Sequence, residues 1–278
     1  MAQRVFNFFL FSSIYISLCA VLMVYQTWHL LGLIHQPGLL PFVFFATLCS
    51  YNTHWYFTPF VATEKLRSSW TARHRHLHFI LIIVGGIGMG FFSISLLGEW
   101  QWILPAAGLT FLYSAPKFPH PVFHKLRKIA VGKTVFLAAV WTYVTCFMPV
   151  LVSDSPLEGQ NFIFCISRFF LIYAICIVFD YRDREMDRKE GIRSVVTLLK
   201  EKQITQLFLL CVFLCCGTTA LLYLKGFTLL VIALLIAPAL LTAALYPVAR
   251  KNHSDYLYYF VLDGLMMISA PFIIFLPI

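Results

Sequence analysis

The chain has 278 residues, of which 60% are hydrophobic and only 12% are charged, and its formal net charge is +9. A soluble domain of ordinary composition carries roughly 25% charged residues, so this chain has too little charge to cover a water-facing surface. The composition excludes an ordinary soluble globular protein and predicts a protein embedded in a lipid bilayer.

Apolar segments long enough to cross a bilayer follow one another along the chain. A crossing needs ~20 predominantly apolar residues. The segments of about this length are 8–34, 39–60, 79–97, 100–116, 129–150, 160–180, 204–224, 226–247 and 256–277. No long polar linker divides the series. The sequence therefore predicts one all-α transmembrane domain over residues 1–278, a polytopic bundle of about nine helices.

Lysine and arginine residues lie almost entirely in alternate connections between these segments. The basic connections are 61–78, 116–133, 180–203 and the one with Arg250 and Lys251, while Arg4 precedes the first segment. Positive residues are retained on the cytoplasmic side of a membrane. We therefore expect the N-terminus and the large basic loops in the cytoplasm. Because the bases are spread over separate loops, they suit anionic lipid headgroups, and nucleic-acid binding is not expected.

The connection after the sixth segment begins with aspartates at helical spacing. Asp180, Asp183 and Asp187 are three and four residues apart, which places them on one helix face. Carboxylates gathered in this way repel one another and suit Mg²⁺, which prefers oxygen ligands. Arg182 and Arg184 are interleaved with the acids, so the spacing alone fits a solvated, salt-bridged loop equally well. Position favours the metal interpretation, because Asp180 ends an apolar segment and its face can point into the bundle.

Other polar residues fall at the same depth of the predicted bundle. They are Asn52 and His54 in the second segment, Tyr113 and Lys117 at the end of the fourth, Lys133 in the fifth and Asp263 in the ninth. Polar and ionisable residues inside a membrane are costly and are functional candidates by default. A single one more often makes a hydrogen bond between helices, but several helices contributing to one layer favour a shared site. Arg168 lies outside this layer and is expected to snorkel outward.

The residues from Asp180 to Ser194 resemble the second aspartate-rich motif of the UbiA-type prenyltransferase superfamily. That motif reads Asp-x-x-Asp-x-x-x-Asp followed by a glycine, and Asp180, Asp183, Asp187 and Gly191 match it in type and spacing. The segment 113–117 is similar to the family's Tyr/Pro/Lys segment after the fourth helix. The expected helix count also agrees, so the resemblance extends over essentially the whole chain.

The resemblance implies an intramembrane enzyme. Family members bind a prenyl diphosphate through Mg²⁺, ionise it, and pass the allylic carbocation to an aromatic or other hydrophobic acceptor. Carried over to this chain, it implies that Asp180, Asp183 and Asp187 bind Mg²⁺, with Asp183 essential for catalysis. The residues expected to contact the substrate, with Lys117 and Arg193 steadying its diphosphate, are Asn52, His54, Tyr113, Lys117, Lys133, Arg193 and Asp263.

The second predicted segment departs from the family pattern. The first aspartate-rich motif of the family reads Asn-Asp-x-x-Asp-x-x-x-Asp, whereas here Asn52 is retained and no carboxylate follows until Glu64. His54 is a poor ligand for Mg²⁺. The sequence therefore fits an active prenyltransferase with a modified site, or a non-catalytic UbiA-like protein that binds an isoprenoid or lipid or supports a membrane complex. A transporter or channel is a third interpretation, which the clustering of polar groups at one face disfavours.

Overall fold

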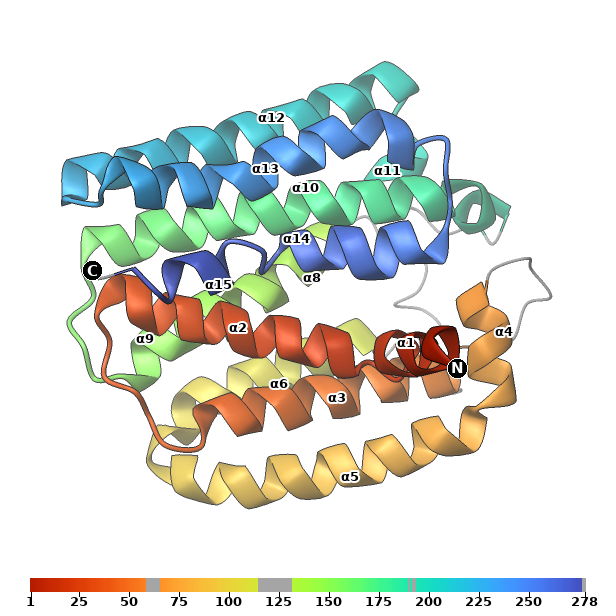
Figure 1. Ribbon diagram of the computed structural model, residues 1–278, viewed down its shortest axis with the longest axis horizontal. Helices are drawn as coiled ribbons and strands as arrows, with labels where there is room; N and C mark the ends of the chain where they lie inside the picture. Colours follow the sequence, from red (N-terminus) through yellow and green to blue (C-terminus); the bar gives the residue numbers. More distant parts are fainter. Residues whose placement is uncertain (59–65, 115–131, 190, 192–193, 277–278) are drawn as a thin grey trace.

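The computed structural model describes residues 1–58, 66–114, 132–189, 191 and 194–276, which form a bundle of helices (Figure 1). No strand occurs among the described residues. Several of their helical segments are long and apolar enough to cross a bilayer, namely Ile14–Leu31, Arg75–Leu112, Lys133–Val152, Gly159–Lys189, Glu201–Lys225 and Leu229–Ala249. The prediction of an all-α polytopic membrane protein is therefore confirmed, while the count of nine crossings stays a prediction.

The helices follow the predicted segments in order, but their ends differ. In the first half of the chain the elements are α1 (Ala2–Phe11), α2 (Ile14–Leu31), α3 (Leu39–Phe57), α4 (Leu66–Arg73), α5 (Arg75–Ser93), η1 (Ile94–Glu99) and α6 (Trp100–Ser114). In the second half they are α8 (Lys133–Thr142), η4 (Tyr143–Phe147), α9 (Met148–Val152), α10 (Gly159–Lys189), α11 (Val195–Leu198), α12 (Glu201–Leu221), η5 (Leu222–Lys225), α13 (Leu229–Ala249), η6 (Leu257–Leu262), α14 (Asp263–Leu265) and α15 (Ala270–Ile273). Buried side chains from most of these elements form one continuous core.

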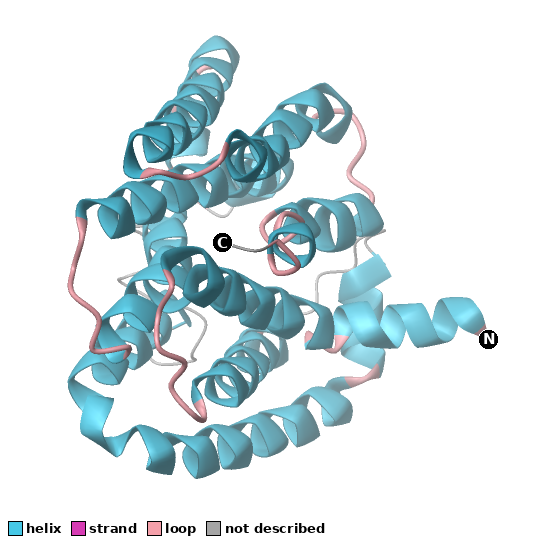
Figure 2. Ribbon diagram, turned by 60° about the vertical axis from the view of Figure 1, so that its left-hand side comes forward, coloured by secondary structure: helices cyan, strands magenta, loops and turns pink. Residues whose placement is uncertain are grey.

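The predicted first segment, 8–34, is two helices rather than one. Ser13 has a φ of 69° and separates α1 from α2. A residue in the left-handed region interrupts a right-handed helix. The chain changes direction there, and α1 lies at an angle to α2 (Figure 2). The Nδ2 group of Asn52 in α3 donates to the carbonyl of Ser12 at 3.0 Å and satisfies a backbone group at this break.

Helices α3 and α5 pack closely through glycine. A Cβ atom added at Gly85 would lie 2.8 Å from the backbone nitrogen of Cys49, and one at Gly88 would lie 2.4 Å from the ring of Phe45. Small residues allow membrane helices to approach in this way. The other face of α5 carries exposed apolar side chains that suit contact with lipid, among them Phe79, Ile80, Ile83, Ile87 and Phe91.

The predicted fifth segment, 129–150, is described from residue 132 onward and is interrupted by a π-helical turn, η4. Pro149 has no N–H to donate to the carbonyl of Thr145, four residues earlier. The hydroxyl of Thr27 in α2 donates to that carbonyl at 2.7 Å instead. A neighbouring helix thus supplies the hydrogen bond that proline removes, which a membrane protein requires because no water is present to do so.

The predicted ninth segment, 256–277, is also not one regular helix. It begins with a π-helical turn, η6, and is broken between α14 and α15. Arg168 of α10 is buried beside the break, and its Nη1 donates to the carbonyl of Met266 at 2.8 Å. Its Nη2 donates to Oε1 of Gln26, whose Nε2 donates to the hydroxyl of Ser269 at 3.0 Å. The expectation that Arg168 snorkels outward is wrong, because the broken helix offers it acceptors inside the bundle.

The two ends of the bundle differ in the connections they carry. The N-terminus, α4, α11 and the turn between α13 and η6 lie at one end, and the C-terminus lies at the other (Figure 1). The described parts of the basic connections therefore gather at one end, as the alternation of charge predicts. The assignment of this end to the cytoplasm stays a prediction.

Candidate functional site

The aspartates of the Asp180–Asp187 motif lie on one helix, α10, which continues to Lys189. Their helical spacing is therefore confirmed. Asp180 is half-buried, the side chain of Asp183 is 37% exposed, and Asp187 is buried. Gly191 follows the helix with a φ of 70°, a value that glycine adopts without strain, and its N–H donates to the carbonyl of Arg188 at 3.1 Å. The glycine of the motif thus ends the helix that carries the acids.

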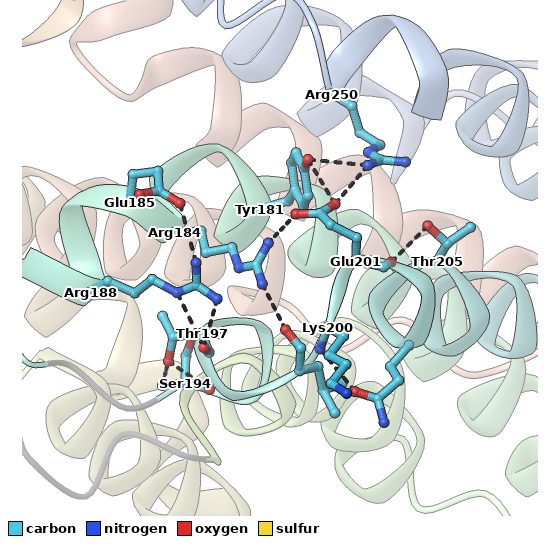
Figure 3. A network of polar contacts seen from close by, with 12 residues as sticks. Tyr181, Arg184, Glu185, Arg188, Ser194, Thr197, Lys200, Glu201, Thr205 and Arg250 are labelled. Atoms are coloured by element: carbon cyan, nitrogen blue, oxygen red, sulfur yellow. Dashed lines mark hydrogen bonds and ion pairs between the residues drawn. The ribbon is translucent and has the colours of Figure 1, made fainter.

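Arg184 and Arg188 of the motif contact elements that follow α10 in the chain (Figure 3). Arg184 donates to the carbonyl of Leu199 at 2.7 Å and to the carboxylate of Glu201 in α12. Glu201 also accepts from Tyr181 at 3.0 Å and from Arg250 at 2.7 Å. Each of these α10 positions follows an aspartate by one residue, a rotation of about 100°. Arg184 therefore joins α10 to α12 and to the turn before it, whereas Arg182 pairs with Asp183 itself.

The acidic face of α10 meets α8, the helix that begins at Lys133. The hydroxyl of Thr134 donates to Oδ2 of Asp180, and the charge of Lys133 acts on the same carboxylate. Asp180 therefore has a hydrogen-bonding partner from a neighbouring helix in the interior of the bundle. The structure therefore brings together two of the predicted site residues from separate helices.

Two neighbouring aspartates of this motif can bind one magnesium ion, but all three cannot bind the same ion. No three Asp, Glu, His or Cys side chains among the described residues are close enough together to hold a metal ion. Residues seven apart on a helix are separated by about 10 Å along its axis, so one ion cannot bind Asp180 and Asp187 directly. Mg²⁺ is commonly bound by one or two carboxylates and completes its shell with water and substrate phosphates. The donor atoms of Asp183 and a neighbouring aspartate suit that arrangement.

Arg182 connects α10 to the start of the ninth segment. Its Nε lies 3.1 Å from Oδ1 of Asp183, and its Nη2 donates to the hydroxyl of Tyr259 at 2.9 Å. Its Cζ lies 4.4 Å from the ring centroid of Tyr258 and 5.0 Å from that of Tyr259. Its Nη1 lies 3.8 Å from Oδ1 of Asp255, too far for a hydrogen bond. Nη1 of this buried arginine therefore makes no hydrogen bond with the described residues.

Arg67 of α4 lies against the same tyrosine ring from another helix. It is 4% exposed, and its Cζ lies 4.1 Å from the ring centroid of Trp55 and 4.3 Å from that of Tyr259. Its backbone N–H donates to Oδ2 of Asp255 at 2.7 Å. Burial lowers the pKa of the Arg67 guanidinium, while Tyr259, Asp263 and Asp255 act in the opposite direction. Cation–π contact with aromatic faces partly replaces the lost water.

Asp263 lies near Arg67 and Arg182, while its predicted contact with substrate stays a prediction. It is half-buried at the start of α14, and the charges of Arg67 and Arg182 act on it. The π-helical turn η6 precedes it and carries Tyr258 and Tyr259. Such turns occur frequently at functional sites. The ninth segment thus contributes an acid and two aromatic rings to the layer that contains the α10 motif.

Asn52 is hydrogen-bonded entirely within the protein. Its Nδ2 donates to the carbonyls of Ser12 and Leu48 at 3.0 and 2.8 Å, and its Oδ1 accepts from Nδ1 of His78 at 2.6 Å. It is fully buried. These contacts give Asn52 a structural role in joining α3 to the α1–α2 break and to α5. They do not support its predicted contact with substrate, which stays a prediction.

The remaining predicted residues are placed as follows. His54 lies edge-on to Trp55, with 5.7 Å between ring centroids. Tyr113 lies in the last turn of α6, but its side chain is outside the described residues, as are Lys117 and Arg193. Their predicted contacts with the diphosphate stay predictions.

The sequence did not identify Arg67, Arg182 or Tyr259 as members of this layer. Arg67 stands in a connection with several other bases, and nothing in its spacing distinguishes it from them. Tyr259 is four residues before Asp263, and this one-turn separation is the signal that could have identified it.

The fold and this layer define the class of protein: a helical membrane protein whose bundle holds charged and aromatic residues at one end. The chain matches the model of the UbiA prenyltransferase family over residues 70–263, which is more than half of its length. The protein therefore belongs to the UbiA prenyltransferase family. The matched range includes the α10 aspartates and Asp263 and begins after α3, where the family pattern is lost. A search of curated proteins finds no match to this chain.

Proposed function

We propose that the protein is a membrane-embedded, Mg²⁺-dependent prenyltransferase that transfers an isoprenoid group from a prenyl diphosphate to an aromatic or lipid acceptor. The observation that carries this proposal is the acidic face of α10, on which Asp180, Asp183 and Asp187 lie together while Arg184 and Arg188 point to other helices. Membership of the family supports the reaction class, and the apolar helices support substrates that partition into the bilayer.

In the proposed reaction the bond between the allylic carbon and the diphosphate oxygen breaks, and both electrons leave with diphosphate. The acceptor then forms a bond to the allylic carbon and loses a proton. Asp183 and a neighbouring aspartate would hold Mg²⁺, which supplies positive charge to the leaving diphosphate. Lys133 offsets part of the negative charge at Asp180. The aromatic side chains around Tyr259 exclude water, which would otherwise capture the allylic cation.

Release of pyrophosphate tests this proposal. Purified protein in detergent would be given farnesyl or geranylgeranyl diphosphate, with and without Mg²⁺, together with a panel of aromatic and lipid acceptors. We expect Mg²⁺-dependent release that Asp183→Asn lowers by about 100-fold or more, since it removes charge needed in the transition state. Glu185→Gln is the matched control, because Glu185 is on the same helix, is exposed and pairs with Arg188. Equal release by wild type and Asp183→Asn would contradict the proposal.

The second candidate is a non-catalytic member of the family that binds an isoprenoid or lipid or supports a membrane complex. The absence of carboxylates from α3 and the internal bonding of Asn52 favour it. Thr53 and Tyr56 stand where the first family motif has aspartates, and both are half-buried. If Thr53→Asp with Tyr56→Asp releases pyrophosphate and a well-folded wild type does not, the natural chain has lost the chemistry. Asn52→Asp is a poorer test, because it removes the N–H donors to Ser12 and Leu48.

A further inference from the structure

In the described part of the layer around Tyr259, buried hydrogen-bond donors without a partner outnumber buried acceptors without one. Within the described part of the chain, Nε and Nη2 of Arg67, Nη1 of Arg182 and Nε1 of Trp55 have no hydrogen-bond partner, although each is fully covered. They come from α4, α10 and α3. Arg67 and Arg182 both lie against the ring of Tyr259, and Arg67 lies over Trp55. The unpartnered donors are thus gathered around one aromatic pair.

Carboxylates near these donors do not satisfy them. Asp255 lacks a hydrogen bond at Oδ1, which lies 3.8 Å from Nη1 of Arg182, and its Oδ2 is used by the backbone N–H of Arg67. Asp183 accepts from Nε and Nη2 of Arg182 and not from Nη1. Asp263 acts on both guanidinium groups through charge alone. The acids therefore balance the positive charge without occupying the free N–H groups.

Unpaired N–H groups are costly inside a membrane protein, since neither lipid nor apolar side chains can accept from them. Guanidinium groups with free N–H donors recognise phosphate through several charge-assisted hydrogen bonds. An acceptor with several oxygen atoms would satisfy donors from all three helices at once.

We propose that Arg67, Arg182 and Trp55 form a metal-free binding site for phosphate oxygens, which takes the diphosphate end of the prenyl donor. The identity of the ligand rests on the proposed function, whereas the affinity for phosphate oxygens does not. Trp55 lies in α3 and Arg67 in the helix that follows it, beside the place where the family's first acidic motif would bind metal. A guanidinium would then supply positive charge there, and Mg²⁺ would be needed only at the α10 aspartates.

Binding of inorganic pyrophosphate in EDTA tests this site without turnover. Isothermal titration of purified protein in detergent would compare wild type with Arg67→Gln and with Arg73→Gln. Arg73 is the matched control, since it lies on the same short helix and is exposed. We expect Arg67→Gln to weaken binding by about tenfold or more, because it removes a charged donor, and Arg73→Gln to leave it unchanged. Trp55→Phe keeps an aromatic ring, although a smaller one, and removes one N–H, so we expect a loss of about two- to fivefold even if Arg67→Gln does not fold.

Further measurements distinguish a diphosphate from an anionic lipid as the ligand. They also distinguish failure of the binding site from failure of the proposed function. If an anionic lipid such as phosphatidylglycerol binds through Arg67 and pyrophosphate does not, the diphosphate assignment is overturned. Equal affinity of wild type, Arg67→Gln and Trp55→Phe overturns the site. Metal-free pyrophosphate binding without any turnover leaves the site standing and removes the proposed function. Mg²⁺-dependent turnover with no metal-free binding of pyrophosphate supports the proposed function and overturns the site.

Discussion

Two arginines are buried to the same extent in this bundle but are surrounded in different ways. Arg168 and Arg67 are each 4% exposed. Arg168 donates to the carbonyl of Met266 and to Gln26, and the ring of Phe164 lies 5.1 Å from its Cζ. Arg67 lies between Trp55 and Tyr259, and two of its nitrogens have no partner among the described residues. One guanidinium is hydrogen-bonded by its surroundings, and the other is only stacked.

The difference separates a structural arginine from one held ready for a ligand. Arg168 lies where the ninth segment is broken, and it satisfies a carbonyl that the break frees. Nε and Nη2 of Arg67 find no acceptor among the described residues. Leaving a buried donor unsatisfied costs about 1–3 kcal/mol. Departures from optimal packing of this kind are expected at functional sites rather than in the scaffold.

The largest expected effect is on turnover, and it distinguishes the two arginines directly. We expect Arg67→Gln to lower pyrophosphate release by about 100-fold, because it removes a positive charge from the leaving group. Arg168→Gln should change turnover per folded molecule by less than about threefold, since Arg168 lies outside the site and a buried polar substitution acts mainly on stability. The measurement is release at saturating prenyl diphosphate, normalised to the folded fraction from size-exclusion chromatography. Comparable losses of turnover in both variants would refute the distinction between a structural arginine and one that binds a ligand.

Much of the fold could be predicted from composition and charge alone. Apolar length identified the order of the helices, and the alternation of bases identified which connections share an end of the bundle. The interruptions at Ser13, at Pro149 and after Leu265 could not be predicted, because each is completed by a distant residue. Thr27 replaces the hydrogen bond lost at Pro149, and its hydroxyl carries no such signal in the sequence.

The candidate site, like the fold, could be predicted from the sequence only where it depends on local spacing. The aspartates could be predicted because helical spacing is a local property, and α10 confirms it. The contacts of Arg184 could not be predicted, since they depend on Glu201 and Leu199 accepting from it. Arg67 could not be distinguished from neighbouring bases until Trp55 and Tyr259 were placed around it. Residues whose role depends on contacts between remote helices leave no periodic pattern.

The next largest effect is on stability at Arg168. Arg168→Met fills a similar volume but leaves Gln26 and the carbonyl of Met266 without their donor. We expect the free energy of unfolding to fall by about 2 kcal/mol, within the cost of unsatisfied buried groups. Unfolding by SDS in mixed micelles measures this quantity. Arg67→Met is the comparison, and we expect it to be neutral or stabilising, since it removes unpaired donors and a buried charge. A larger loss at Arg67 than at Arg168 would reverse the interpretation of the two environments.

A smaller effect is the coupling between Arg168 and Gln26. If the two side chains stabilise the break as a pair, Gln26→Leu in the Arg168→Met background should cost less than Gln26→Leu alone. We expect a coupling energy of about 1 kcal/mol, since hydrogen bonds between membrane helices measure ~0.6 and at most ~1.7 kcal/mol. The four proteins of the double-mutant cycle would be unfolded under the same conditions. Additive losses would show that Arg168 acts on Met266 without Gln26.

The smallest effect is expected at a third arginine, Arg184, whose partner is exposed. The side chain of Glu201 is 52% exposed although it accepts from Arg184, Arg250 and Tyr181 (Figure 3). Water and salt screen such a pair, so Glu201→Gln should cost less than about 1 kcal/mol and less still in high salt. Turnover should be unchanged, because the network lies away from the acidic face of α10. A loss of activity without a loss of stability would show that this network orients the aspartates and belongs to the site.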